Sequence, residues 1–442
     1  MRGVSVLIAG AGLAGLTAAR ELRTRGAAVT VIDARNRVGG RVLTVREPFL
    51  RGEHAEAGAD LIDESQTEIC RLIAGVGLRT TKILPGGFTS VRQIGRQRRP
   101  GGKRAWEDLG KRLRPEVRAL CVSEQRWDGG VAASLARESV VEWLDRIRAP
   151  KSLRDVAIGL RGFFLADPSE LSLLALADQF ADEGAPGREK MFRIAGGNDR
   201  LPALLARALG SNLRLQTVLR RVTQTPHGVT AALESNGHVQ EARFDYLVCA
   251  MPATTVRDVV FEPGLPALQR EAVTSVKYGP ATKTALQFDR APWRKRDKPR
   301  AFGTPFSIGA VWDGNEEQRG SILTLLAGGG ASAATREMLA VEGPSRLVRE
   351  LSWLNLSKTT LVAWTTLSWE SERWSRGGYA YFDQQFSPPL RYWLARPFDR
   401  VFFAGEHTSL RWQGYMNGAV ESGLRAAEEV SRSTIRTWHT SA

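Results

Sequence analysis

The chain opens with Val4-Ser-Val-Leu-Ile-Ala-Gly10-Ala-Gly12-Leu-Ala-Gly15, an apolar run that passes directly into the spacing Gly-X-Gly-X-X-Gly. The apolar, β-rich residues 4–9 predict a short strand buried in a parallel sheet. Gly10 allows a tight turn, Gly12 lets the backbone approach a pyrophosphate, and Gly15 lets the next helix pack against the strand. This order of strand, glycine turn and helix is typical of a dinucleotide-binding α/β fold.

The residues that follow extend this prediction. A helix from Leu13 to about Arg25 would direct its N-terminal amides and the positive end of its dipole at the phosphates. A second strand is expected at 28–32, and Asp33 follows it at the place where a carboxylate can accept hydrogen bonds from a ribose diol. The sequence therefore predicts an adenine dinucleotide site.

The chain has 43% apolar and 25% charged residues, a composition typical of globular proteins. Its length of 442 residues predicts two domains. No apolar run is long enough to span a bilayer. The three cysteines, Cys70, Cys121 and Cys249, lack the spacing of metal ligands and fit a reducing compartment. We expect a cytoplasmic protein without a metal site or membrane attachment. The sequence leaves open whether the protein forms a homodimer.

The net charge of +15 could attract nucleic acid, anionic lipid or acidic partners. The densest basic run spans 92–104 and includes Arg96, Arg98, Arg99 and Lys103, interrupted by Pro100-Gly-Gly. We expect a solvated surface loop here, since no nucleic-acid-binding motif accompanies the run and aromatic residues do not alternate with the charges. A nucleic-acid partner is therefore not predicted.

A second glycine-rich segment lies near the C-terminus. It reads Val401-Phe-Phe-Ala-Gly405-Glu406-His-Thr, followed by Gly414-Tyr-Met-Asn-Gly-Ala419. We expect a strand from about 400, a loop, and a helix over 415–430. Between the two ends, residues 75–185 are rich in helix formers and predict a mostly helical region, whereas 213–223, 228–233, 242–250, 282–288, 322–326 and 360–364 predict strands.

These motifs resemble the flavin-dependent amine oxidases, the group of monoamine oxidases, polyamine oxidases and L-amino-acid oxidases. The resemblance is strong at both ends and includes Gly196-Gly197, Val222, Pro252 and Lys283 in the middle. It implies non-covalent FAD, because Tyr379 follows Gly377-Gly378 where some relatives attach the flavin through cysteine. It also implies an α/β fold in which a discontinuous Rossmann-like FAD-binding domain (1–75, 190–280, 396–442) is interleaved with a substrate domain of mixed sheet and helices (76–189, 281–395).

The resemblance assigns cofactor contacts residue by residue. The implied FAD-binding residues are Gly10, Gly12, Ala14, Gly15, Asp33, Ala34, Arg35, Gly40, Arg41, Gly58, Ala59, Asp60, Val222, Trp369, Gly405, Glu406, Gly414, Tyr415, Met416 and Ala419. Val222 would meet the adenine through its backbone, and Met416 would open a helix whose positive end stabilises the reduced flavin.

Three residues would act on the substrate or on oxygen. Lys283, in an apolar β-patterned segment, matches the family lysine that holds a water near flavin N5. Tyr379 and Tyr415 match the two aromatic side chains that flank the amine, and Tyr381 is an alternative if the alignment shifts. These residues imply transfer of hydride from the carbon beside the amine nitrogen to the flavin, which O2 then reoxidises.

The substrate prediction depends on departures from the family pattern. Leu61 stands where amino-acid oxidases carry a carboxylate-binding arginine, which disfavours an α-amino acid unless Arg411 replaces it. Asp63 could pair with a cationic amine or be an ordinary turn acid. We expect a primary or secondary amine; an L-amino-acid oxidase, a flavin-dependent desaturase or isomerase, and a non-enzymatic FAD-binding scaffold remain as alternatives.

Overall fold

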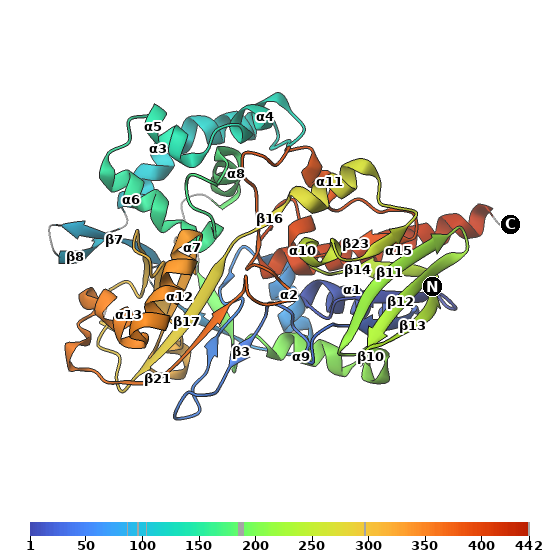
Figure 1. The fold of residues 1–442 in the computed structure, drawn as a ribbon, viewed down its shortest axis with the longest axis horizontal. Helices are drawn as coiled ribbons and strands as arrows, with labels where there is room; N and C mark the ends of the chain where they lie inside the picture. The colour runs from blue at the N-terminus through green and yellow to red at the C-terminus, as the bar shows by residue number, and fades with distance from the viewer. Residues whose placement is uncertain (86, 95–96, 103, 184–189, 296–297, 441–442) are drawn as a thin grey trace.

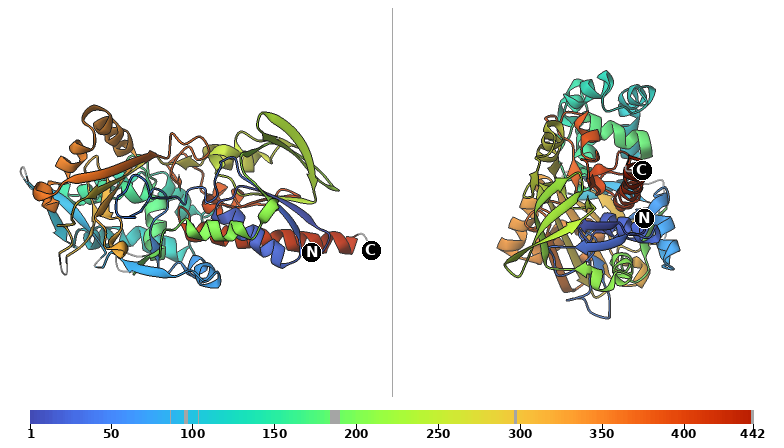
Figure 2. Two further views of the ribbon diagram at one scale, coloured as in Figure 1. Left: turned by 90° about the horizontal axis from the view of Figure 1, so that it is seen from below. Right: turned by 90° about the vertical axis from the view of Figure 1, so that its right-hand side faces the viewer.

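A computed structural model of the chain describes residues 1–85, 87–94, 97–102, 104–183, 190–295 and 298–440, and both termini lie at one end of the elongated molecule (Figures 1 and 2). At that end a five-stranded sheet is parallel throughout, in the order β10-β2-β1-β14-β23. Its strands are β1 (Ser5–Ala9), β2 (Ala28–Ile32), β10 (Leu213–Arg214), β14 (Tyr246–Cys249) and β23 (Val401–Phe403).

Apolar side chains cover both faces of this sheet, as a buried parallel sheet requires. Along β1, Val6 and Ile8 join one cluster with helices α1 (Leu13–Thr24) and α15 (Met416–Thr440), while Leu7 and Ala9 join a second cluster on the opposite face. Because the strands run in one direction, their carboxyl ends meet at one edge, the usual ligand-binding edge of such folds.

Smaller sheets join this region to the rest of the chain. The sheet β13-β12-β11-β15 covers one side, and β5-β9-β6, β3-β4 and β16-β22 lie between the two halves. Their bounds are β11 (Thr217–Thr225), β12 (Gly228–Ser235), β13 (His238–Phe244), β15 (Val260–Glu262), β3 (Thr44–Val45), β4 (Ala55–Glu56), β5 (Ile62–Asp63), β6 (Thr80–Ile83), β9 (Met191–Ile194), β16 (Lys277–Tyr278) and β22 (Ala380–Tyr381).

The other half contains a seven-stranded mixed sheet in the order β21-β17-β20-β19-β18-β7-β8, in which only β18 and β7 pair in parallel among the described strands. Its strands are β7 (Phe88–Ile94), β8 (Gln97–Gly102), β17 (Ala281–Phe288), β18 (Ala301–Gly303), β19 (Ala310–Asp313), β20 (Ile322–Gly328) and β21 (Leu361–Ser368). β17 is buried along its whole length, which places Lys283 inside the protein.

Helices cover this sheet and form a separate lobe at its upper side in Figure 1. The lobe comprises α3 (Arg104–Val122), α4 (Gly130–Ala136), α5 (Val140–Arg146), α6 (Lys151–Gly159), α7 (Arg161–Phe164) and α8 (Leu173–Glu183). The remaining helices are α2 (Thr67–Gly75), α9 (Arg200–Arg207), α10 (Ala253–Val256), α11 (Ala267–Ser275), α12 (Gly330–Glu342), α13 (Pro344–Glu350) and α14 (Leu390–Trp393).

The fold class is as predicted, a mixed α/β architecture with a nucleotide-binding parallel sheet. In the region 75–185, which was predicted to be mostly helical, the strands β6, β7 and β8 precede the helices α3 to α8. The basic run is not a loop: its described residues form the hairpin β7–β8 and the start of α3, and Arg98 pairs with Glu350. Arg96 and Lys103 lie outside the described residues.

Candidate active site

One long cavity lies at the carboxyl edge of the parallel sheet and continues between the seven-stranded sheet and the helical lobe. It brings together both glycine-rich ends of the chain, which are about 400 positions apart. The predicted site residues that line it are Gly10, Gly12, Ala14, Asp33, Ala34, Arg35, Gly40, Arg41, Gly58, Ala59, Asp60, Asp63, Lys283, Trp369, Tyr379, Gly405, Glu406, Gly414, Tyr415, Met416 and Ala419.

The first glycine turn has the shape that a pyrophosphate needs. A Cβ atom at Gly12 would meet no heavy atom within 4 Å, so the space beside it is open to the cavity. A Cβ at Gly15 would instead lie 1.9 Å from the Gly10 carbonyl oxygen, which explains why Gly15 packs α1 against β1 and does not line the cavity. Gly10 itself adopts a φ of +113°, which side chains rarely allow.

Asp33 is held at the end of β2 by two backbone amides. Its carboxylate accepts hydrogen bonds from the amides of Ala11 at 2.8 Å and Arg35 at 2.9 Å. Burial raises the pKa of Asp33, and these amides together with the Arg35 charge oppose that effect. The Arg35 guanidinium donates to Glu372 and Ser375, so it closes the side of the cavity near Asp33 as half of an ion pair.

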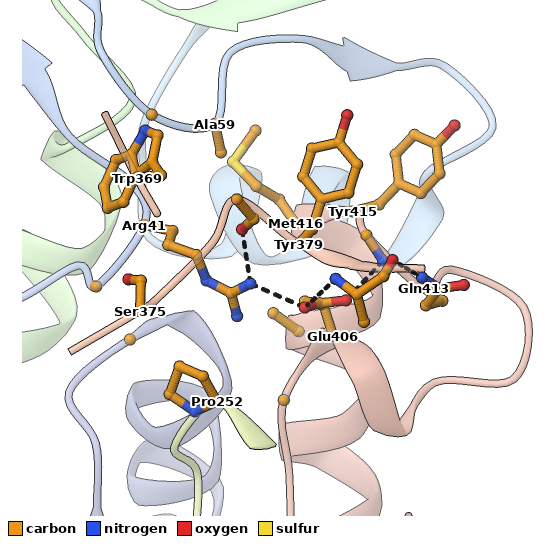
Figure 3. A pocket seen from close by; sticks show the side chains of 18 of the residues that line it. Arg41, Ala59, Pro252, Trp369, Ser375, Tyr379, Glu406, Gln413, Tyr415 and Met416 are labelled. Carbon is orange, nitrogen blue, oxygen red and sulfur yellow. Dashed lines mark hydrogen bonds and ion pairs between the residues drawn. The ribbon is translucent and has the colours of Figure 1, made fainter. Parts of the chain in front are cut away.

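Arg41 and Glu406 connect the two ends of the chain across the cavity (Figure 3). Arg41 donates to the Glu406 carboxylate at 2.9 Å and to the Gly378 carbonyl at 2.8 Å, while the Gly414 amide donates to Glu406 at 2.7 Å. Burial opposes the charge of Arg41, but Glu406 and Tyr278 together outweigh burial and raise the pKa of Arg41. The cation therefore remains charged beside the glycine turn, where phosphate binding requires positive potential.

Val222, the residue expected to meet the adenine, lies outside the cavity lining. It is buried in β11, whereas Thr217, Val218, Leu219 and Arg220 line the cavity. The Thr217 amide donates to the Asp33 carbonyl at 2.9 Å, which brings the start of β11 to the ribose-binding edge. An irregularity in the pairing between Leu219 and Arg221 separates this part of the strand from Val222.

Tyr379 and Tyr415 present their rings side by side with the hydroxyls pointing the same way (Figure 3). The Tyr379 hydroxyl donates to the Phe163 carbonyl at 2.5 Å, and the Tyr415 hydroxyl accepts from Gln179 at 3.0 Å. Burial, with a smaller contribution from Glu406, raises the pKa of Tyr379, so this phenol stays neutral. Tyr381 also lines the cavity.

Lys283 projects from β17 into the same cavity and is only 5% exposed. Its ammonium donates to the Gly58 carbonyl at 2.8 Å and to the Asp60 carboxylate at 2.9 Å. Burial lowers the pKa of Lys283, and Asp60 only partly offsets that effect. Asp60 therefore contacts the lysine directly.

The remaining predicted residues lie around these groups. Trp369 is buried and its indole donates to the Ala57 carbonyl at 2.9 Å. Asp63 is half-buried, lines the cavity, and accepts from the amide and hydroxyl of Ser65. Leu61 also lines the cavity, and Arg411 is an exposed residue of its lining.

Several functional residues carry no recognisable sequence motif. Gln179, on α8, contacts Tyr415, while Arg193 and Trp312, on β9 and β19, contact Asp60. For Arg193 the sequence does offer a signal, because it lies in the otherwise apolar strand Met191–Ile194. A charge inside such a run requires a buried partner. Gln179 lies in an ordinary amphipathic helix, where its contact cannot be foreseen.

Three further observations complete the description of the site and of the chain. Burial lowers the pKa of His407 to about 4, so this imidazole is neutral near pH 7. Among the described residues, no group of His, Cys, Asp and Glu side chains has the arrangement of a metal site. No helix in the described parts of the chain combines the length and apolar character needed to cross a bilayer.

Comparisons with known proteins agree with this geometry. Amine oxidase [flavin-containing] B of Homo sapiens is 26% identical over 467 residues, covering 96% of this chain and 85% of that protein. The solved structure of cyclohexylamine oxidase from Brevibacterium oxydans IH-35A has a TM-score of 0.84 at 24% identity and covers 98% of this chain and 99% of its own. That of wild-type putrescine oxidase bound to putrescine also has a TM-score of 0.84, at 24% identity, covering 97% and 99%.

The family model described as flavin containing amine oxidoreductase matches residues 13–431, which include the C-terminal glycine-rich segment and every residue of the cavity lining except Ala9, Gly10 and Gly12. The open space at Gly12, the carboxylate of Asp33 and the N-terminus of α15 suit the FAD of that family. The chain therefore belongs to the flavin-containing amine oxidoreductases, enzymes that use FAD as their cofactor.

Proposed function

We propose that this enzyme oxidises a primary or secondary amine to an imine and that O2 then reoxidises its FAD. The observation that supports this most is the pair of aromatic rings, Tyr379 and Tyr415, in the cavity that also contains Lys283. When bound, FAD would accept two electrons from the carbon next to the amine nitrogen and pass them to oxygen.

The two tyrosines would position the amine. Aromatic faces carry negative electrostatic potential and attract the electron-poor groups attached to nitrogen. The contacts of Tyr379 with Phe163, and of Tyr415 with Gln179, fix both rings from the helical lobe, so the space between them does not depend on substrate binding. A pre-formed slot lowers the entropic cost of orienting the amine.

Lys283 would act on oxygen. Its ammonium lines the cavity and has three N–H donors, of which two are used by Gly58 and Asp60. The third can hold a water or stabilise negative charge that develops on oxygen. No protein base is needed at the substrate carbon, which agrees with the place of His407 outside the cavity lining and with its lowered pKa, which makes it a weak base.

The substrate is proposed to be an amine without an α-carboxylate. Leu61 lines the cavity where an arginine would be needed, and a buried carboxylate without a partner would be costly. The structurally similar proteins include a cyclohexylamine oxidase and a putrescine oxidase, which supports amines of different shapes as candidate substrates. Asp63 offers a partner for a second cationic group, and the three free cysteines support a place in the cytoplasm.

Anaerobic titration tests this function. A panel of alkyl, arylalkyl and diamines, with L-amino acids and polyenes as controls, is mixed with the oxidised holoenzyme while flavin absorbance is followed. At least one amine should bleach the flavin and the α-amino acids should not. Bleaching by a polyene or an amino acid, and by no amine, would contradict the proposal.

A further inference from the structure

The ammonium of Lys283 is enclosed by three groups from two segments of the chain. The Gly58 carbonyl and the Asp60 carboxylate accept two of its N–H bonds, and the Trp312 ring centre lies 5.1 Å from the nitrogen. The Lys283 and Asp60 side chains are only 4% and 5% exposed. This contact is therefore a buried ion pair, whose two members depend strongly on each other.

Asp60 is in turn oriented by two more donors. Arg193 donates to one carboxylate oxygen at 2.5 Å, while Trp312 donates to the oxygen that also accepts from Lys283, at 3.0 Å. Arg193 is 1% exposed and is anchored on its far side by the Glu317 carboxylate and the Asp313 carbonyl. The carboxylate of Asp60 therefore has little freedom to rotate away from the lysine.

The charges of this cluster balance. Two cations, Lys283 and Arg193, face two anions, Asp60 and Glu317. The fifth titratable group is Glu56, whose pKa burial and the nearby Asp60 raise to about 8, so it is mostly neutral near pH 7. Burial opposes ionisation of Asp60, but Arg193 and Lys283 outweigh it and hold the pKa of Asp60 below its ordinary value.

We propose that Asp60 is a positioning residue for the reaction with oxygen, which holds the Lys283 ammonium charged and directs its remaining N–H into the cavity. This inference rests on the proposed role of Lys283. Asp60 lines the cavity but uses both oxygens on the cluster, so its function differs from the flavin contact that the resemblance implies. Without the carboxylate, Lys283 would lose its direct anionic partner and keep the cation Arg193 nearby in a buried site, with Glu56 as a more distant acid, and its pKa would fall.

The test compares D60N, K283M and the double variant K283M/D60N as FAD-loaded enzymes. The flavin is reduced with light rather than with an amine, and its reoxidation by dissolved O2 is followed between pH 6 and 9. D60N should reoxidise about ten-fold more slowly than wild type at pH 8, since one unit of pKa corresponds to about ten-fold in the charged fraction. It should approach the wild-type rate at pH 6, which shifts the pH profile to lower pH.

A second readout does not depend on turnover. A nearby cation stabilises the reduced flavin, so the reduction potential of bound FAD should fall as Lys283 loses its proton. This fall should occur at a lower pH in D60N than in wild type. E317Q is the matched control, since it removes a charge from the same cluster but leaves the contact between Asp60 and Lys283 intact. Its pH profile should follow that of the wild type.

The outcomes separate the two proposals. If K283M reoxidises like the wild type, the role of Lys283 in the proposed function is wrong. If K283M is slow but D60N keeps the wild-type pH profile, Asp60 is not its positioning residue. The reoxidation rate of K283M/D60N should equal that of K283M, and a slower rate in the double variant would also overturn the inference. This comparison does not require D60N alone to fold.

Discussion

The individual side chains of this site act mostly as members of pairs. Arg41 is matched by Glu406, Arg35 by Glu372, and Lys283 by Asp60. Since an unpaired charge in a buried cavity is costly, each pairing stabilises a charge where a cofactor or oxygen needs it. Tyr379, in contrast, stays neutral because burial raises its pKa, and under the proposed function its ring and that of Tyr415 position the amine.

Removing the ring of Tyr415 should weaken catalysis more than removing its hydroxyl. Y415A loses an aromatic face worth about 2 kcal/mol in a desolvated site, or about 30-fold in kcat/KM. Y415F keeps the ring and loses only the contact with Gln179, so its loss should be a few-fold at most. Steady-state kinetics with the best amine measure both; equal losses in the two variants would argue against a role for the ring.

Glu56 should make stability depend on pH. Its carboxyl accepts from the Asn198 amide and the Thr44 hydroxyl, and its pKa rises from 4.5 to about 8 in the folded protein. Between these values the folded state keeps a proton that the unfolded state has lost, so the free energy of unfolding falls as pH rises, by at most about 1.4 kcal/mol per unit.

E56Q should remove this dependence. Thermal melts of wild type and E56Q at pH 5 and pH 8.5 measure this dependence. The Tm of E56Q minus that of wild type should be larger at pH 8.5 than at pH 5. A difference between the two Tm values that does not change with pH would show that Glu56 is ionised in the folded protein.

Helices α1 and α15 meet at a position where only glycine fits. A Cβ at Gly423, on α15, would lie 2.4 Å from the Ala14 carbonyl oxygen of α1, whereas a Cβ at Gly12 would meet nothing. Gly423 therefore serves the packing of two helices, and Gly12 leaves room for the cofactor.

G423A and G12A should separate these two roles. G423A overpacks the crossing of α1 and α15 and should lower the free energy of unfolding of the apoprotein by about 1–3 kcal/mol. G12A should leave that value within about 0.5 kcal/mol of wild type and reduce FAD affinity at least about ten-fold, since its methyl group enters the phosphate space. Urea unfolding and flavin fluorescence titration measure the two quantities, and equal stability losses in both variants would contradict the assignment.

The molecule as a whole is held together by contacts between segments distant in sequence. Arg391, on α14, has a 2% exposed side chain that pairs with Asp178 of α8 at 2.7 Å and donates to the Leu410 carbonyl. Its guanidinium lies 4.0 Å from the Trp127 ring centre of the helical lobe. This residue thus joins the lobe to the loop that leads to Tyr415, next to the Gln179 contact.

R391M should affect stability and catalysis together. It leaves the carboxylate of Asp178 without its cation, which costs about 3–5 kcal/mol for a buried pair. It should also raise KM, because α8 and the Tyr415 loop lose a shared anchor. The control R126Q removes an exposed pair with Asp128 and should change neither Tm nor KM; a wild-type KM in R391M would show that the anchor does not act on the substrate slot.

Much of the secondary structure was predictable from the sequence, and the exceptions have physical causes. β2 is found at the predicted residues, and α1 begins at the predicted Leu13, because apolar periodicity and glycine turns are local signals. The single strand expected over 242–250 is instead two, β13 and β14, in different sheets, since which sheet a strand joins is not encoded in its own pattern. α15 continues past Val430 to Thr440, beyond the predicted end.

The order of residues along the chain determined the nucleotide-binding sheet, the glycine cradle and the family, because each depends on short motifs whose chemistry is local. The tertiary structure alone decided which charges meet: Asp60 with Lys283 and Arg193, Arg41 with Glu406, and Asp178 with Arg391. Partners in a buried ion pair can be hundreds of residues apart, and their choice follows from the packing of whole elements rather than from any pattern in one segment.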